Sequence, residues 1–131
     1  MKVSSFSFSI IVILSWIVSV CLVSYLSLTP EVEFPLDFRW CDKVYHLLAY
    51  VWLSSLPFIG FTGRKTALVG SLLMIPLGIG LEFGQSFVPG RFYSERDMIA
   101  NAFGSITGIL FGMYLFKRRN NLDRANKTQK S

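Results

Sequence analysis

Histidine and cysteine are scarce in this sequence. The chain of 131 residues holds one histidine and two cysteines. Zinc sites usually take two or more His or Cys ligands, so a zinc enzyme or zinc finger is not expected. Nor does the sequence contain a P-loop, a nucleophile elbow or an H-E-x-x-H motif. These absences lead us to expect neither a bound metal ion nor another cofactor.

Charge is nearly absent from four long stretches, of which only the third contains a charged residue, Glu82. Hydrophobic residues make up 52% of the chain and charged residues 16%. The apolar residues fall into four runs, each close to the roughly 20 residues that a transmembrane helix requires. We therefore predict an all-α membrane protein with one transmembrane domain over residues 1–116 and a basic tail over 117–131. Its four helices are expected at residues 6–28, 44–61, 66–88 and 98–116.

The first run is longer than the apolar region of a usual signal peptide, so it is interpreted as a retained helix. Pro57 and Pro76 are expected to kink the second and third helices. Neighbouring groups within the protein should then satisfy the carbonyls that these prolines free.

Lysine and arginine are unevenly placed. Nine of the 13 precede the first helix, join the second to the third, or follow the fourth. Because such residues collect on the cytoplasmic side, we predict a multi-pass protein of the cell membrane with both termini in the cytoplasm. The basic tail suits contact with anionic lipid headgroups. No nucleic-acid module fits in the chain, so the lipid bilayer is the expected partner and nucleic acid is not.

Polar residues gather at one depth under this topology, namely the outer boundary of the membrane. Glu82 and Gln85 share a helix face near the end of the third helix, and His46 lies near the start of the second. Asp97 fits as the N-cap of the fourth helix. An ionisable residue inside a span, here Glu82, is by default a candidate functional residue. The expected site comprises Lys43, His46, Glu82, Gln85, Arg91, Ser94, Asp97 and Asn101.

Glycine repeats every four residues along the fourth helix, at Gly104, Gly108 and Gly112. A stripe of small residues lets another helix approach closely, so we expect a packing role for these glycines. The oligomeric state is left open, and a homo-oligomer is one of the alternatives.

Two motifs resemble those of the VanZ-like family of small bacterial integral membrane proteins. Residues 42–50 read D-K-x-x-H-x-x-x-Y, and residues 82–104 read E-x-x-Q-x-x-x-P-G-R-x-x-S-x-x-D-x-x-x-N-x-x-G. The similarity covers residues 42–112, more than half of the chain. It implies a polytopic membrane protein, and the expected site residues are the motif residues. The family's namesake is associated with resistance to teicoplanin, a glycopeptide that binds cell-wall precursors, but the resemblance supplies no mechanism.

The preferred function is binding or modulation of an envelope lipid. Lys43 and Arg91 would hold the anionic headgroup of a phospholipid or of a lipid-linked cell-wall precursor, since the arginine fork suits phosphate. Glu82 and Asp97 would hold these cations in place, and the sequence does not decide which carboxylate pairs with Arg91. The remaining polar residues, Gln85, Ser94 and Asn101, would orient the ligand.

Two further functions stay open. An intramembrane enzyme acting on an anionic lipid or envelope substrate would use Glu82 or His46 as general acid or base. A version with a metal ion on His46, Glu82 and Asp97 is disfavoured by the single histidine. A small proton-coupled transporter is disfavoured because the polar residues gather at one face, whereas a transport path should reach the midplane.

Overall fold

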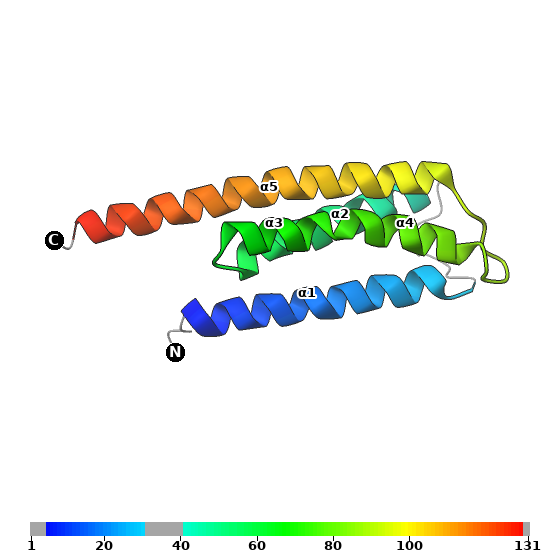
Figure 1. Cartoon of the computed structure of the whole chain (residues 1–131), viewed down its shortest axis with the longest axis horizontal. Coiled ribbons are helices and arrows are strands. Elements are labelled where there is room, and N and C mark those ends of the chain that lie inside the picture. The colour runs from blue at the N-terminus through cyan, green and yellow to red at the C-terminus, as the bar shows by residue number, and fades with distance from the viewer. Residues whose placement is uncertain (1–4, 31–40, 130–131) are drawn as a thin grey trace.

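The computed structural model describes residues 5–30 and 41–129, and every element in these ranges is helical. The prediction of an all-α protein is therefore confirmed. Figure 1 shows the helices lying lengthwise beside one another. They are α1 (Ser5–Leu28), α2 (Cys41–Gly60), α3 (Arg64–Leu72), α4 (Met74–Gln85) and α5 (Glu95–Thr128).

Three stretches are long and apolar enough to cross a membrane: Phe6–Leu28, Arg64–Gln85 and Glu95–Thr128. A membrane protein is thus supported at this coarser level. Helix α2, which corresponds to the second predicted span, is not among the three, because its first turns carry Asp42, Lys43 and His46. Its crossing and the side on which the termini lie remain predictions. Two lysines of the predicted charge pattern, Lys2 and Lys130, lie outside the described residues.

The third predicted helix, 66–88, is interrupted. Helix α3 ends at Leu72 and α4 begins at Met74. Pro76 accounts for the break, because proline lacks the N–H that would bond to the carbonyl four residues earlier and its ring crowds that carbonyl. The carbonyl in question belongs to Leu72, where α3 ends.

Pro57 lies inside α2 without ending it. It leaves the carbonyl of Leu53 without its usual helical donor. Trp16 of α1 supplies the replacement, since its indole Nε1–H donates to the Leu53 oxygen at 2.9 Å. The expectation that a neighbouring helix satisfies the freed carbonyl is therefore confirmed at Pro57. The same hydrogen bond links α1 to α2.

Helix α5 is longer than predicted at both ends, running from Glu95 to Thr128 instead of 98–116. The segment expected as a basic tail is helical as far as Thr128. It contains no proline or glycine and several good helix formers, so nothing in its sequence ends the helix.

Helices α2 and α5 approach so closely that only glycine fits between them. A Cβ atom added at Gly104 or Gly108 would collide with the carbonyl oxygens of Leu47 and Val51, respectively. A Cβ at Gly112 would lie 2.6 Å from the ring of Phe58. The glycines at 104, 108 and 112 therefore lie against α2 of the same chain. They fix the position of α5 along α2.

The bundle has two distinct ends. Helix α1 begins and α5 finishes at one end, whereas α2 begins and the connection from α4 to α5 lies at the other (Figure 1). The polar residues of interest occupy the second end, which we call the site end.

Candidate functional site

A tight turn directs the chain from α4 into α5. The N–H of Arg91 donates to the carbonyl of Val88 at 3.1 Å, and Gly90 between them has φ of 80°. Proline followed by glycine with positive φ is typical of a type II turn.

Ser94 begins α5 and corrects one expectation. Its hydroxyl oxygen accepts from the backbone N–H of Asp97 at 3.3 Å, so Ser94 is the N-cap. Asp97, expected as the cap, is instead the third residue of the helix. The helix starts earlier because a serine three residues ahead of Asp97 reaches its free N–H. This leaves the Asp97 carboxylate available for contacts with other helices.

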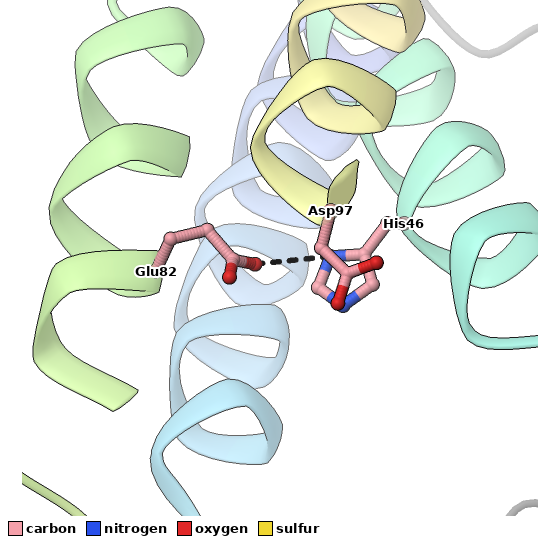
Figure 2. Close-up of side chains that lie close together, drawn as sticks. All are labelled: His46, Glu82 and Asp97. Atoms are coloured by element: carbon pink, nitrogen blue, oxygen red, sulfur yellow. Dashed lines mark ion pairs between the residues drawn. The ribbon is translucent and has the colours of Figure 1, made fainter. Parts of the chain in front are cut away.

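Three ionisable side chains meet at the site end, one from each of three helices. They are His46 of α2, Glu82 of α4 and Asp97 of α5, and Figure 2 shows Glu82 pointing toward the imidazole ring of His46. His46 Nδ1 lies 3.6 Å from Glu82 Oε1. One nitrogen or oxygen of each side chain lies within 4.8 Å of the others. We call this group the carboxylate–histidine cluster.

Asn101 connects two members of the cluster. Its Oδ1 lies 2.9 Å from His46 Nδ1, and its Nδ2 lies 3.5 Å from Glu82 Oε1. An amide oxygen only accepts hydrogen bonds, so the proton of this contact is on His46 Nδ1. Asn101 is buried in α5 and therefore holds the imidazole ring and the Glu82 carboxylate in a fixed relation.

The two cations of the site have different partners. Lys43 forms an ion pair with Asp97, with Nζ 3.2 Å from Oδ1. Arg91 donates from Nε to the carbonyl of Thr29 at 3.1 Å and from Nη2 to that of Leu26 at 3.2 Å. Its partners are thus carbonyls at the end of α1, where a helix leaves such groups unsatisfied.

The sequence left open whether Glu82 or Asp97 pairs with Arg91. Neither carboxylate forms an ion pair with Arg91 in the part of the chain that the structure describes. Among the described residues, the Arg91 guanidinium is therefore bonded to backbone carbonyls and to no carboxylate.

A cavity of about 540 Å³ lies beside the cluster. Helix α1 contributes the apolar residues Val23 and Leu26 to its wall. The polar part of the wall comes from α2, α4, the turn and α5, and includes Lys43, His46, Gln85, Arg91, Ser94 and Asp97. The cavity thus combines a charged wall with an apolar one.

The structure brings the predicted site residues together at one end of the bundle. Six of them line the cavity, while Glu82 and Asn101 contact His46. Several contributions were missed, among them Asp42, Tyr45, Tyr50, Phe92 and the wall from α1. Tyr50 also lines the cavity, and its spacing of four residues from His46 was the available signal. The wall from α1 had no signal, because that helix carries no charge and its apolar residues are not confined to one face.

The described part of the chain is thus all-helical, with three stretches able to cross a membrane and a polar cavity at one end. No protein-family model and no solved structure matches the chain. The chain is 29% identical over 107 residues to an uncharacterised protein of the fission yeast Schizosaccharomyces pombe. The match covers 79% of this chain but 64% of the yeast protein, so this chain spans less than two thirds of that relative.

Proposed function

We propose that this protein binds the anionic headgroup of a membrane lipid in the cavity at the site end. In this proposal the chain is a four-span protein of the VanZ-like kind in the cell membrane, with α2 as the additional crossing. Both termini lie in the cytoplasm, and the cavity opens at the outer face. The two motifs and the charge pattern of the sequence support this arrangement.

The observation that carries the proposal is the mixed wall of the cavity. Arg91 lies in the polar wall, and within residues 5–30 and 41–129 no carboxylate forms an ion pair with it; Lys43 lines the same wall. A phosphate would gain a charge-assisted hydrogen bond from either cation. Val23 and Leu26 form the adjoining apolar wall, against which an acyl chain would pack. A lipid has this same division between a charged head and an apolar chain.

Between the two candidate ligands, a phospholipid is favoured over a lipid-linked cell-wall precursor. The similar protein comes from a fungus, whereas the cell-wall precursor is suggested only by the resemblance to a bacterial family. That comparison gives no support to a bacterial cell-wall role or to glycopeptide resistance. Phosphatidylglycerol is therefore the first ligand to test.

The test is an equilibrium titration of the purified protein in neutral detergent. Phosphatidylglycerol should bind at least about tenfold more tightly than zwitterionic phosphatidylcholine, a preference worth about 1.4 kcal/mol. Lys43→Gln should remove most of this preference, whereas Arg124→Gln, at an exposed position of α5, should leave it intact. Equal binding of both lipids by the wild-type protein would contradict the proposal.

A second candidate function is an intramembrane enzyme acting on such a lipid. The observation in its favour is the contact between His46 and Glu82, which places a potential acid and base beside the cavity. Incubation with a phospholipid should then yield a product detectable by mass spectrometry, with a rate lost in Glu82→Gln. Binding without turnover would favour the first candidate.

A further inference from the structure

The carboxylate–histidine cluster joins residues that are far apart in the sequence. His46, Glu82 and Asp97 come from three different helices, yet their ligand atoms all lie within 4.8 Å of one another. Two ligands on opposite sides of one ion lie about 4.4 Å apart, given metal–ligand distances of about 2.2 Å. We propose that these three side chains bind one divalent transition-metal ion, with Mn²⁺ as the first candidate to test.

Glu82 provides an independent observation that points to a ligand. Its side chain is 1% exposed, and its Oε2 atom is buried without a hydrogen-bond partner among the described residues. Buried polar atoms of native proteins nearly always have a partner, and an unpaired carboxylate oxygen is costly to bury. A cation bound by the cluster would supply that partner.

The charges of the cluster support the same conclusion. Glu82 and Asp97 are both buried, and Lys43 is the cation that forms an ion pair with Asp97. Two carboxylates held this close repel each other unless a proton or a cation offsets one charge. Lys43 offsets one of the two carboxylate charges. A divalent ion would offset the other and make the net charge of the cluster positive. If the lipid proposal also holds, the headgroup phosphate would be a further ligand, but the metal site does not depend on it.

Asn101 prepares the histidine for such a role. Nδ1 of His46 is the ring nitrogen that lies 3.6 Å from Glu82 Oε1, and it donates to Asn101 Oδ1, so an ion would bind the lone pair on Nε2 of the neutral ring. Metal-binding histidines almost always donate their second ring N–H to an oxygen in this way, which fixes the tautomer. Asn101 is in turn held by its hydrogen bond to Glu82. We therefore regard Asn101 as a positioning residue.

The ligand set determines the class of metal. One imidazole nitrogen with two carboxylate oxygens is a poor match for Mg²⁺ or Ca²⁺, which prefer oxygen ligands throughout. It also lacks the thiolates of structural zinc sites. The two carboxylates suit Mn²⁺ and the imidazole suits Zn²⁺; we test Mn²⁺ first, because it leaves positions for water or phosphate, with Zn²⁺ as its competitor. Because His46 and Asp97 line the cavity, an ion can reach the cluster from there.

The experiment uses the full-length chain in neutral detergent without anionic lipid, after treatment with a chelator. Titration with Mn²⁺, followed by the electron paramagnetic resonance of the free ion, should show one ion bound per chain. A Zn²⁺ competition arm tests the alternative metal. Glu82→Gln and Asp97→Asn should each weaken binding at least about tenfold. Glu95→Gln, an exposed carboxylate two residues from Asp97, is the matched control and should change nothing.

A spectroscopic readout separates ligation from a structural effect. The bound Mn²⁺ should show hyperfine coupling to an imidazole nitrogen, and His46→Gln should abolish this coupling. Wild-type protein that is folded yet binds neither Mn²⁺ nor Zn²⁺ stoichiometrically would overturn the proposal, as would undiminished binding by Glu82→Gln. The lipid titration is run separately in chelator, so that failure of the metal site and failure of lipid binding are distinguishable.

Discussion

The two ends of the helical bundle are stabilised by similar contacts but differ in what they bury. At the site end, Arg91 donates to two carbonyls at the end of α1. At the opposite end, Arg119 donates to the carbonyls of Ile59 and Phe61 at the end of α2. At the opposite end, Phe116 packs edge-on against Phe58 at 6.2 Å between ring centroids, and the Arg119 guanidinium lies over its ring.

The difference lies in the carboxylates. The site end buries Glu82 and Asp97, whereas the end around Phe116 buries aromatic rings. Burying a charged group costs more free energy than burying an aromatic ring. Pairing with an opposite charge often does not recover this desolvation cost. The comparison teaches that arginine caps serve the fold at both ends, while the buried carboxylates indicate function at one.

The largest expected effect on stability concerns the close contact between α2 and α5 at Gly104. Gly104→Leu should destabilise the protein by about 3 kcal/mol or more, because the side chain would collide with the backbone of α2. Thermal unfolding in detergent measures the loss. Gly80→Ala is the control, since its added Cβ would meet nothing within 4 Å and alanine favours a helix. Equal stability of Gly104→Leu and the wild type would show that α2 and α5 are not so close.

The arginine caps should be equivalent for stability and different for binding. Arg91→Met and Arg119→Met should each cost about 1.5–3 kcal/mol, because each removes charged donors from part-buried carbonyls. Only Arg91→Met should weaken the binding of phosphatidylglycerol. Unfolding and lipid titrations on both variants provide the check. Equal loss of lipid binding in the two variants would mean that the ends do not differ in function.

The role of Asn101 in positioning His46 can be tested separately from its contribution to the fold. Asn101→Ala should lower Mn²⁺ affinity by about 10–100-fold, because the imidazole ring of His46 loses the group that fixes its tautomer. Asn121→Ala, on the exposed face of the same helix, should leave the affinity unchanged. The readout is the Mn²⁺ titration. An unchanged affinity in Asn101→Ala would remove Asn101 from the site.

The smallest effect is expected at the start of α5. Ser94→Ala should destabilise the protein by about 1 kcal/mol, because the N–H of Asp97 loses its capping oxygen. Ser94→Gly should cost only a few tenths of a kcal/mol. Comparison of the two unfolding midpoints tests the cap directly. A larger loss in the glycine variant would argue against capping as the role of Ser94.

The sequence predicted the elements of this fold better than their ends. The apolar runs identified the helices, but α5 is capped by Ser94 rather than by Asp97, because two good capping residues lie three positions apart. The break at Leu73 was not predicted either. Proline acts on a carbonyl four residues earlier, so the kink expected at Pro76 interrupts the helix before it.

The candidate site was predicted in its members but not in its pairings. Spacing and topology grouped His46, Glu82 and Asp97, because all three lie near helix ends on the same side. The partners of Arg91 could not be predicted. They are backbone carbonyls, which every residue has, so no residue type in the sequence identifies them. The single histidine of the sequence argues against a metal ion, whereas in the structure the ligand atoms of the three side chains lie within 4.8 Å of one another.

Whether the carboxylate–histidine cluster and the cavity form a single site is tested most directly by one spectroscopic measurement. Wild-type protein loaded with Mn²⁺ is mixed with phosphatidylglycerol, and the electron–nuclear coupling of the ion to phosphorus is recorded. A phosphorus coupling that disappears in Lys43→Gln is the predicted result. A bound ion that shows imidazole coupling but no phosphorus coupling at saturating lipid would contradict the shared site.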